Sequence, residues 1–469
     1  MTPLAPSERQ RAFTMAKKQD VVEKQRLPVR YHVEDADVRE RPRRFLEAFA
    51  AILKHSNYRV ALDQYLRVAA RCSRCTTNCQ VFLATGNDHD IPCYRSELLL
   101  KVYRRHFTMA GILQGRLLGD PGLTDPDIQR MADTFYDCTA CRRCSLECPM
   151  GIDHGLLTHL GRYILSEIGI VPRALAVSVR EQLTGASGNT SAVPLPALQD
   201  TLEFLTDELR DENGIEASFP IDQFDAEYLF LAPVSDYIME AETIMGIGAL
   251  FHATGDSWTI GSAYFDAINY GLFYNDQILE HVLHKVEAEA TRLRARKILI
   301  GECGHASRCA KNFYPAYCLE SKALPVVNII EYAHQAWKSG RLKLNPQAVL
   351  EPVTYHDPCN LARSGWIVDQ PRVLIRAFCP NYVEMTPSGR ENICCGGGGG
   401  AVSLDETRPY RTLVGGRAKA EQIRATGAKI CIAPCANCKK QLRELMEEHK
   451  IDCRIVGLHD LLYKAIVYE

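Results

Sequence analysis

The sequence predicts a helical domain followed by a larger α/β domain that is built from two similar lobes. Three observations support this architecture. Apolar residues between Phe45 and Arg71 recur at spacings of three and four, which is the period of an amphipathic helix. Residues 185–196 have the small and turn-forming composition of a linker. After this linker, one strand, loop, helix and strand pattern occurs twice, which indicates an internal repeat.

Length and composition indicate an ordinary globular protein. The chain has 469 residues, a formal net charge of -2 and 46% hydrophobic residues. The near-neutral charge does not favour a nucleic-acid partner. No apolar run approaches the roughly 20 residues of a membrane span, and Met1 to Leu4 lack the apolar core of a secretory signal. We therefore expect a cytoplasmic protein without a transmembrane segment of its own.

The N-terminal segment, residues 1–44, is rich in charges of both signs. This composition predicts a solvated or partly disordered arm. The alternative is an arm that docks on a partner subunit or on an anionic membrane surface, and the sequence does not separate the two. We assign residues 45–184 to the helical domain.

The chain contains 19 cysteines, which fall into tight groups. Disulfide scaffolds are typical of short secreted chains, so metal ligation explains these groups better. One group reads C-x2-C-x2-C-x3-C-P and consists of Cys138, Cys141, Cys144 and Cys148. This is the bacterial ferredoxin motif, a specific signal for a [4Fe-4S] cubane. Arg142 and Arg143 lie between these ligands, where they would compensate the charge of an anionic cluster.

The other N-terminal group is irregular and reads C-x2-C-x3-C-x13-C, with Cys72, Cys75, Cys79 and Cys93. In two-cluster ferredoxins the fourth cysteine of each run ligates the other cluster. Cys148 should therefore complete the cluster that the irregular group holds. Either Cys79 or Cys93 could complete the cluster held by Cys138, Cys141 and Cys144, and the order along the chain favours Cys93. Together the eight cysteines predict two [4Fe-4S] cubanes.

Helices are predicted over residues 97–105, 127–136 and 156–168, around the two cysteine groups. Helices that bracket two cubanes resemble an α-helical ferredoxin domain, the form seen in iron–sulfur subunits of succinate dehydrogenase. A further amphipathic helix is predicted over residues 197–209. We assign residues 185–226 to the linker and this helix.

The internal repeat has a strand, a helix and a second strand in each copy. The first copy predicts strands at 228–231 and 297–301 and a helix at 276–293; the second predicts strands at 353–356 and 429–433 and a helix at 416–426. When the copies are superposed, Cys303 falls on Cys435 and Ala306 falls on Cys438. We expect two α/β lobes, residues 227–345 and 346–469, related by a pseudo-twofold axis.

The second lobe carries five cysteines in the pattern C-x34-CC-x39-CxxC. They are Cys359, Cys394, Cys395, Cys435 and Cys438. Soft thiolates select iron–sulfur clusters or zinc, and zinc takes only four ligands. Five glycines follow the adjacent pair, and the first two, Gly396 and Gly397, would let the backbone approach a cluster closely. Because the first lobe has no such pair, one further cluster is expected, between the lobes.

This pattern resembles the CCG domain of heterodisulfide reductases and of the iron–sulfur subunits of glycolate oxidase and anaerobic glycerol-3-phosphate dehydrogenase. The resemblance implies that the five cysteines hold a noncubane [4Fe-4S] cluster. With the segment 301–308, the chain resembles more narrowly the cytoplasmic proteins DsrK, HmcF and TmcB of membrane redox complexes. That resemblance implies a membrane cytochrome b-type partner, a small thiol carrier protein of the DsrC type, and a place on the cytoplasmic face of the membrane.

The function implied is electron transfer through two cubanes to or from the noncubane cluster, where a disulfide or trisulfide is reduced or formed. The side chains expected near that cluster are Cys303, His305, Arg308 and His356, with histidine as the proton source. Each has a structural alternative: Cys303 would be a buried remnant of the repeat, and a histidine at a strand end would only position its neighbours.

Two other functions remain open. The chain could serve a quinone-linked 2-hydroxyacid or glycerol-3-phosphate dehydrogenase, or it could be a scaffold that only conducts electrons. Relatives with the first function usually carry two complete CCG sets and a regular first ferredoxin motif, and this chain has neither. The sequence does not indicate the direction of electron flow.

Overall fold

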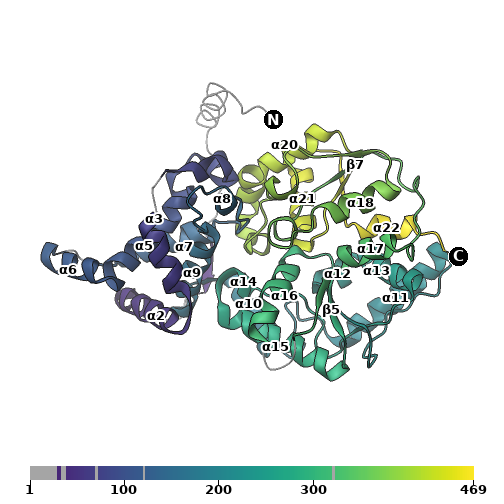
Figure 1. Cartoon of the computed structure of the whole chain (residues 1–469), viewed down its shortest axis with the longest axis horizontal. Coiled ribbons are helices and arrows are strands. Elements are labelled where there is room, and N and C mark those ends of the chain that lie inside the picture. Colours follow the sequence, from purple (N-terminus) through teal and green to yellow (C-terminus); the bar gives the residue numbers. More distant parts are fainter. Residues whose placement is uncertain (1–28, 33–37, 69–71, 120–121, 319–322, 469) are drawn as a thin grey trace. The chain divides into compact units, whose positions relative to one another are not determined.

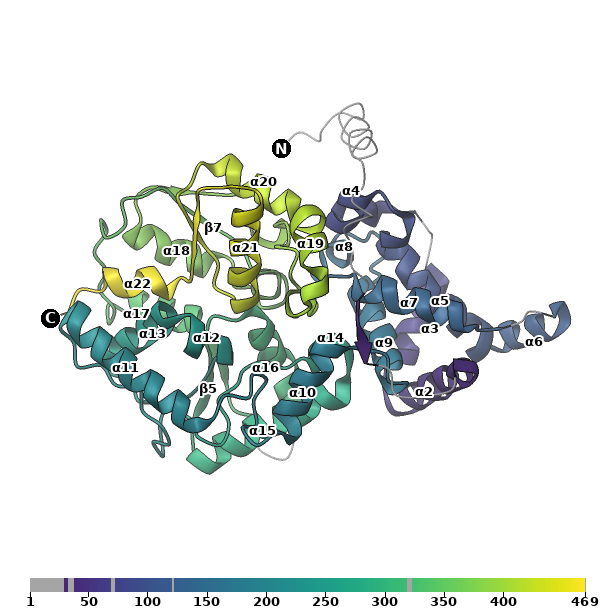
Figure 2. The same cartoon turned by 180° about the vertical axis from the view of Figure 1, so that it is seen from behind.

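The computed structural model describes residues 29–32, 38–68, 72–119, 122–318 and 323–468. These residues form two compact units (Figures 1 and 2). The helical unit takes in the described residues up to Ala176, together with Phe273–Asn275 and Gly396–Ala418. The α/β unit contains Val177–Leu272, Asp276–Cys395 and the described residues from Lys419 onward. No helix in these ranges combines the length and apolar character needed to cross a bilayer.

The helical unit consists mainly of short and medium helices. They are α2 (Arg41–His55), α3 (Tyr58–Val68), α4 (Gln80–Thr85), α5 (Pro92–Phe107), α6 (Met109–Leu118), α7 (Asp125–Tyr136), α8 (Arg143–Leu146) and α9 (His154–Glu167). The helices predicted over 97–105, 127–136 and 156–168 are confirmed as α5, α7 and α9. The helical pattern over 45–71 is divided between α2 and α3, because Ser56 has an extended backbone and its hydroxyl donates back to the carbonyl of Ile52.

An aromatic core holds these helices together. Phe49 of α2 packs against Tyr103 and Phe107 of α5, with ring centroids 6.1 Å and 4.8 Å away. Gly161 of α9 lets Phe135 of α7 approach closely, since a Cβ at this position would lie 2.1 Å from the Phe135 ring. The buried aromatic contacts fix α5, α7 and α9, the helices that surround the cysteines.

Part of the predicted N-terminal arm belongs to this unit. Tyr31–His32 form strand β1, which pairs antiparallel with β2 (Val171–Pro172), and α2 already begins at Arg41. The Tyr31 ring lies 5.8 Å from that of Tyr136, so an aromatic contact anchors the strand. The prediction of a solvated arm is therefore wrong for these residues. Residues 1–28 and 33–37 of the arm lie outside the described residues.

The α/β unit contains two four-stranded parallel sheets. The first has the order β4-β3-β5-β6, with β3 (Tyr228–Leu231), β4 (Trp258–Ile260), β5 (Lys297–Ile300) and β6 (Val326–Asn328); the second has the order β8-β7-β9-β10, with β7 (Val353–Tyr355), β8 (Tyr382–Val383), β9 (Ile430–Ile432) and β10 (Arg454–Val456). Taken in chain order, the strands occupy equivalent places in both sheets. The predicted two-lobed repeat is therefore consistent with the fold.

Helices cover the two sheets. In this unit lie α11 (Leu195–Asn213), α12 (Val234–Met239), α13 (Ala241–Thr254), α15 (Asp276–Leu293), α16 (Gly304–Tyr317), α17 (Ile329–Lys338), α18 (Asp369–Phe378), α21 (Ala436–Glu448) and α22 (His459–Ala465). The chain passes between the units within α10 (Arg173–Thr184), α14 (Gly271–Tyr274) and α20 (Arg417–Thr426). The predicted helices at 276–293 and 416–426 are confirmed as α15 and α20, and the one at 197–209 is longer, as α11.

The two lobes share one hydrophobic core. Buried residues of α13, α17 and α18 belong to the same cluster as those of α22. Gly246 of α13 permits this packing, because a Cβ there would lie 2.2 Å from the carbonyl oxygen of His459. The predicted boundaries at 184, 226 and 345 stay predictions. The segment 396–418, assigned by sequence to the second lobe, groups instead with the helical unit.

Candidate functional site

Two cavities in the helical unit are each lined by four cysteines. The first contains Cys72, Cys75, Cys93 and Cys148, and the second contains Cys79, Cys138, Cys141 and Cys144. These are the eight cysteines expected from the sequence, and none of the eight is in a disulfide. Four thiol donors around one cavity are the ligand set of a [4Fe-4S] cubane, so the residues present fit two such clusters.

The two cavities divide the cysteines differently from the order along the chain. Cys148 joins the first set, as expected, but Cys79 rather than Cys93 joins the second. A 3-10 turn, η3 (Arg74–Asn78), separates Cys75 from Cys79, and Cys93 in the first turn of α5 returns to hydrogen-bond with Cys75. Order along the chain was therefore a poor guide, because the direction of α5 decides which cavity Cys93 reaches.

A buried arginine accompanies the second cavity. Arg95 of α5 is 2% exposed, and its Nη2 lies 3.7 Å from the Sγ of Cys79. Burial opposes its charge, but the electrostatic interaction with Cys138 and Cys79 outweighs this effect and raises the pKa of Arg95. Sequence reasoning proposed Arg142 as a compensating charge; it lines this cavity and forms an ion pair with Asp153. Arg95 was missed, because an arginine within a helical pattern carries no special signal.

Replacing Arg95 with glutamine is expected to lower the reduction potential of the second cubane. A positive charge stabilises the reduced cluster, which is the more negative state. For a charge about 7 Å from the cluster, at an effective dielectric constant of about 20, this stabilisation is about 2 kcal/mol. For a one-electron couple this corresponds to roughly 100 mV. An EPR-monitored redox titration measures the shift, with Arg142→Gln as the more exposed control. An unchanged potential in Arg95→Gln would show that Arg95 has only a packing role.

His154 of α9 lines both cysteine cavities. The Oγ of Ser96 lies 2.8 Å from its Nδ1, and the imidazole is 4% exposed. Burial lowers the pKa of His154 to about 4, so the ring is neutral at physiological pH. A neutral polar ring between the two thiol sets adds no positive charge that would favour one cluster over the other.

The glycine run packs on the segment that carries Cys138. A Cβ at Gly398 would lie 2.3 Å from the carbonyl oxygen of Thr139, and one at Gly399 would lie 2.6 Å from that of Cys138. The buried Arg162 bridges the two segments, donating to the carbonyls of Gly399 at 2.9 Å and Cys138 at 2.6 Å. The sequence predicted a close approach of glycine backbone to a cluster. At Gly398 and Gly399 the close approach is to another stretch of backbone.

In the α/β unit, the five predicted thiols lie in one continuous chain of contacts. The Sγ atoms of Cys359 and Cys394 are 3.9 Å apart, and those of Cys395 and Cys438 are 3.5 Å apart. Hydrogen bonds link Cys394 to Cys395 and Cys435 to Cys438. Cys359 follows β7 and Cys435 follows β9, so the carboxyl ends of neighbouring parallel strands bring them together.

A sixth thiol extends this chain. Cys303 is fully buried and hydrogen-bonds with Cys435, its equivalent in the other lobe. Both residues directly precede a helix, α16 after Cys303 and α21 after Cys435. The hydrogen bond with Cys435, together with burial, raises the pKa of Cys303, and the bond from Cys303 lowers the pKa of Cys435. The two shifts have opposite directions, which favours Cys303 over Cys435 as the thiol that keeps its proton.

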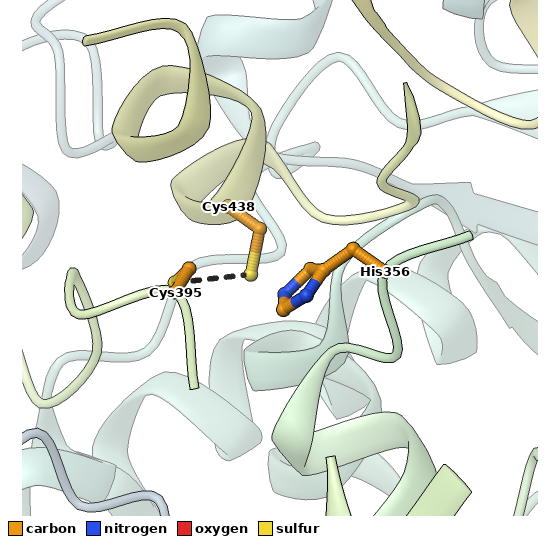
Figure 3. Close-up of side chains that lie close together, drawn as sticks. All are labelled: His356, Cys395 and Cys438. Atoms are coloured by element: carbon orange, nitrogen blue, oxygen red, sulfur yellow. Dashed lines mark hydrogen bonds between the residues drawn. The ribbon is translucent and has the colours of Figure 1, made fainter. Parts of the chain in front are cut away.

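His356 is the histidine nearest these sulfurs. Its ring faces Cys395 and Cys438, and ligand atoms of the three side chains lie within 4.8 Å of one another (Figure 3). The Nδ2 of Asn392 lies 3.4 Å from the Nδ1 of His356, which assigns the ring proton to Nε2. Burial and the nearby Lys419 lower the pKa of His356, so the ring is neutral.

Lys419 supplies a buried positive charge behind this histidine. Its ammonium donates to the Oδ1 of Asn392 at 2.7 Å and to Gln422. Burial lowers the pKa of Lys419 to about 8, while Asp357, Cys395 and Cys394 act in the opposite direction. Asn392 thus connects the lysine to the histidine. Sequence reasoning missed Lys419, since a lysine in an amphipathic helix normally faces solvent.

His305 and Arg308 contact loops around the thiols. His305 is 2% exposed, and its Nε2 accepts the backbone N–H of Asn269 at 3.1 Å. Burial lowers the pKa of His305 to about 4. Arg308 donates to the side chain of Asn360, the residue after Cys359, at 3.4 Å. Of the two predicted histidines, His356 therefore has its ring nitrogen beside the sulfurs, and the Nε2 of His305 is engaged by the backbone.

A buried ion network joins the lobes next to Cys438. Lys439 is fully buried, and its ammonium lies 3.6 Å from Asp236 and 3.3 Å from Glu240, both from the first lobe. It also donates to Thr243 at 2.8 Å. Burial raises the pKa of Asp236 to about 7. Removing one member of such a network leaves an uncompensated charge, so the network holds the lobes in one relative position.

The donor chemistry distinguishes a cluster from zinc. His356, Cys395 and Cys438 alone would suit a single small ion. The thiol chain, however, continues through Cys394 and Cys435 to further sulfurs, which is more than the four donors that one zinc ion accepts. The residues present therefore fit a multi-iron cluster with thiolate ligands.

Comparisons with known protein families agree with both sites. Residues 353–443 match the cysteine-rich domain CCG, and residues 70–152 match the 4Fe-4S dicluster domain. The dicluster match implies two [4Fe-4S] cubanes, and the CCG match suggests a further cluster. The class is thus an iron–sulfur protein that combines a helical dicluster domain with a CCG domain.

Relatives that match over most of the chain specify this class further. The chain is 27% identical over 466 residues to the "Hdr-like menaquinol oxidoreductase iron-sulfur subunit 2" of Archaeoglobus fulgidus, covering 90% of this chain and 83% of the relative. It is 25% identical over 402 residues to one subunit of the dihydromethanophenazine:CoB--CoM heterodisulfide reductase of Methanosarcina mazei, covering 85% and 93%. The chain is therefore similar over most of its length to iron–sulfur subunits of the heterodisulfide reductase-like group, and it carries the cysteine-rich and dicluster regions described above. The narrower DsrK-type resemblance stays a prediction.

Proposed function

We propose that this chain is the iron–sulfur subunit of a membrane-associated redox complex, and that it reduces or forms a disulfide or trisulfide at the thiol chain of the α/β unit. The observation that carries this proposal is the continuous chain of six thiols, two of which, Cys395 and Cys438, have their sulfurs within 4.8 Å of a ring nitrogen of His356. The ligands proposed are Cys359, Cys394, Cys395, Cys435 and Cys438, with Gly396 and Gly397 beside them. When bound there, a noncubane [4Fe-4S] cluster supplies single-electron transfer next to the substrate sulfur.

The chemistry requires protons as well as electrons. Cleavage of one disulfide consumes two electrons and two protons and yields two thiols. The ring of His356 faces Cys395 and Cys438, and its N–H can hydrogen-bond to a departing thiolate. Lys419, connected through Asn392, offsets the negative charge that develops there.

The other predicted residues have indirect roles in this proposal. Cys303 donates a hydrogen bond to Cys435 and so stabilises the thiolate form of that ligand. His305 and Arg308 are positioning residues, because they act through Asn269 and Asn360. Among the four residues expected from the sequence, only His356 is proposed to touch the reacting sulfur.

The proposed partners follow from the relatives and from the predicted resemblance. One relative is named a menaquinol oxidoreductase subunit and another a heterodisulfide reductase subunit. We propose that this chain likewise exchanges electrons with a quinone-linked cytochrome b-type membrane subunit, on the cytoplasmic face. The proposed sulfur substrate is a small thiol carrier protein of the DsrC type.

Replacing His356 with glutamine is expected to slow disulfide reduction by about 100-fold, the lower range for loss of a positioned hydrogen-bond donor that stabilises developing negative charge. Iron content should stay unchanged, since His356 is not a proposed ligand. The assay follows oxidation of a reduced viologen by the disulfide form of a DsrC-type protein. His281→Gln, on the exposed face of α15, is the matched control. Wild-type turnover in His356→Gln would remove this histidine from the mechanism.

EPR separates the proposal from the two alternatives. If the site acts on sulfur, the cluster signal of the oxidised protein should change when thiol substrate is added. A subunit that only conducts electrons should show no change. A change with glycolate or glycerol 3-phosphate in the assembled complex, and none with thiols, would instead favour the dehydrogenase alternative.

A further inference from the structure

Helix α6 has its small residues inside and its large apolar residues outside. A Cβ at Gly111 would lie 1.8 Å from the carbonyl oxygen of Arg104, and one at Gly115 would lie 1.8 Å from the guanidinium carbon of Arg105. The large apolar side chains are exposed instead: Met109 by 76%, Leu113 by 54%, Leu117 by 84% and Leu118 by 72%. A surface helix normally shows the opposite arrangement, with its bulky apolar face packed on the protein.

The exposed residues form one continuous stripe. Met109, Leu113 and Leu117 are four residues apart, so they lie on the same side of the helix, and Leu118 adjoins them. Within the helical unit, α6 extends away from the other helices (Figures 1 and 2). The stripe is therefore accessible along its whole length in this unit, which is unusual for four large apolar side chains.

Positive charges lie on α6 and on the end of α5 that precedes it. The last turn of α5 contains Arg104, Arg105 and His106, and Arg116 lies in the last turn of α6. A cavity beside these helices is lined by Lys101, Arg105, His106 and Arg130, with Asp127 as its acidic lining residue. The surface therefore combines a projecting apolar helix with a basic cavity, which complements the apolar interior and the anionic headgroups of a phospholipid surface.

We propose that α6 binds in the plane of an anionic phospholipid bilayer, with Met109, Leu113, Leu117 and Leu118 in the acyl region and the basic cavity against phosphate headgroups. A lipid surface explains Arg116 better than a protein partner does. Arg116 lies between Leu113 and Leu117, where a protein interface would have to pair or bury its charge. At a bilayer its guanidinium can extend to the headgroups while its neighbours stay in the apolar region.

This binding mode rests on the membrane location proposed above and not on the disulfide chemistry. Membrane binding by α6 and disulfide chemistry at the thiol chain can therefore fail separately. A protein that binds vesicles without reducing a disulfide would leave α6 as a membrane helix, and one that reduces the disulfide without binding vesicles would leave the proposed function intact.

The test is vesicle co-sedimentation of the full, cluster-loaded chain. Vesicles of phosphatidylcholine alone are compared with vesicles that also contain phosphatidylglycerol, at low and high salt. We expect binding to the anionic vesicles, reduced by salt, and a loss of at least about tenfold in affinity for the double variant Leu113→Gln, Leu117→Gln. Phe204→Gln, which removes a 57% exposed apolar side chain from α11, is the matched control and should bind like the wild type.

Several results would overturn the proposal. These are absence of binding to anionic vesicles, equal binding to both vesicle types, or unchanged binding by the double variant. Association of α6 with a detergent-solubilised membrane subunit, in place of vesicles, would identify a protein as the occupant and would also overturn it. Because both leucines are exposed, unchanged iron content and disulfide turnover in the double variant verify that the chain is correctly folded.

Discussion

Replacing Cys395 with serine is expected to abolish disulfide turnover and to remove one cluster while both cubanes remain. Cys395 lies in the middle of the thiol chain, where it contacts Cys394, Cys438 and His356. It is 1% exposed, so no external ligand can easily replace it. Removing a residue that only hydrogen-bonds to a metal ligand typically lowers activity by about 10–100-fold. Removing the ligand itself should therefore lower disulfide turnover by more than about 100-fold.

Iron analysis and EPR together measure this result. Two cubanes and one noncubane cluster correspond to about twelve irons per chain, and the variant should retain about eight. Cys431→Ser is the matched control, because Cys431 is fully buried in β9 and is not among the proposed ligands. Twelve irons in Cys395→Ser would contradict the proposed ligand set. Zinc in the α/β unit of anaerobically purified wild-type protein would contradict the cluster itself.

Replacing Cys79 or Cys93 with alanine is expected to damage different cubanes. Cys79 shares its cavity with Cys138, whereas Cys93 lies in the other cavity with Cys148. Two substitutions around one cluster should cost no more iron than one, because the cluster is already lost. The double variant Cys79→Ala, Cys138→Ala should therefore lose one cubane, and Cys93→Ala, Cys138→Ala should lose both.

The two double variants should differ clearly in the number of irons that each chain retains. About eight irons should remain when Cys79 and Cys138 are replaced, and about four when Cys93 and Cys138 are replaced. The Cys138→Ala single variant provides the reference. If Cys93 rather than Cys79 completed the second cubane, the two values would be exchanged. Loss of both cubanes in every variant would instead show that neither cluster forms without the other.

Local sequence patterns predicted the parts of this protein that depend on short spacing. The C-x2-C-x2-C-x3-C-P run and the adjacent Cys394 and Cys395 indicated their chemistry, because a few residues of backbone determine how thiols can converge on one cluster. The repeated strand and helix pattern indicated two equivalent lobes, in which Cys303 and Cys435 have the same place before a helix. The helical spacing of apolar residues located α5, α7, α9 and α15 to within a few residues.

Other features depended on packing between distant segments. The assignment of Cys79 in place of Cys93 follows from the turn η3 and the direction of α5, and the burial of Arg95 and Lys419 follows from the helices packed around them. Likewise, His356 faces the sulfurs while the backbone of Asn269 engages His305. The sequence by itself determined which thiols are available and how many clusters to expect. Only the tertiary structure decided which thiols share a cavity and which charges accompany them, because these contacts join residues far apart in the chain.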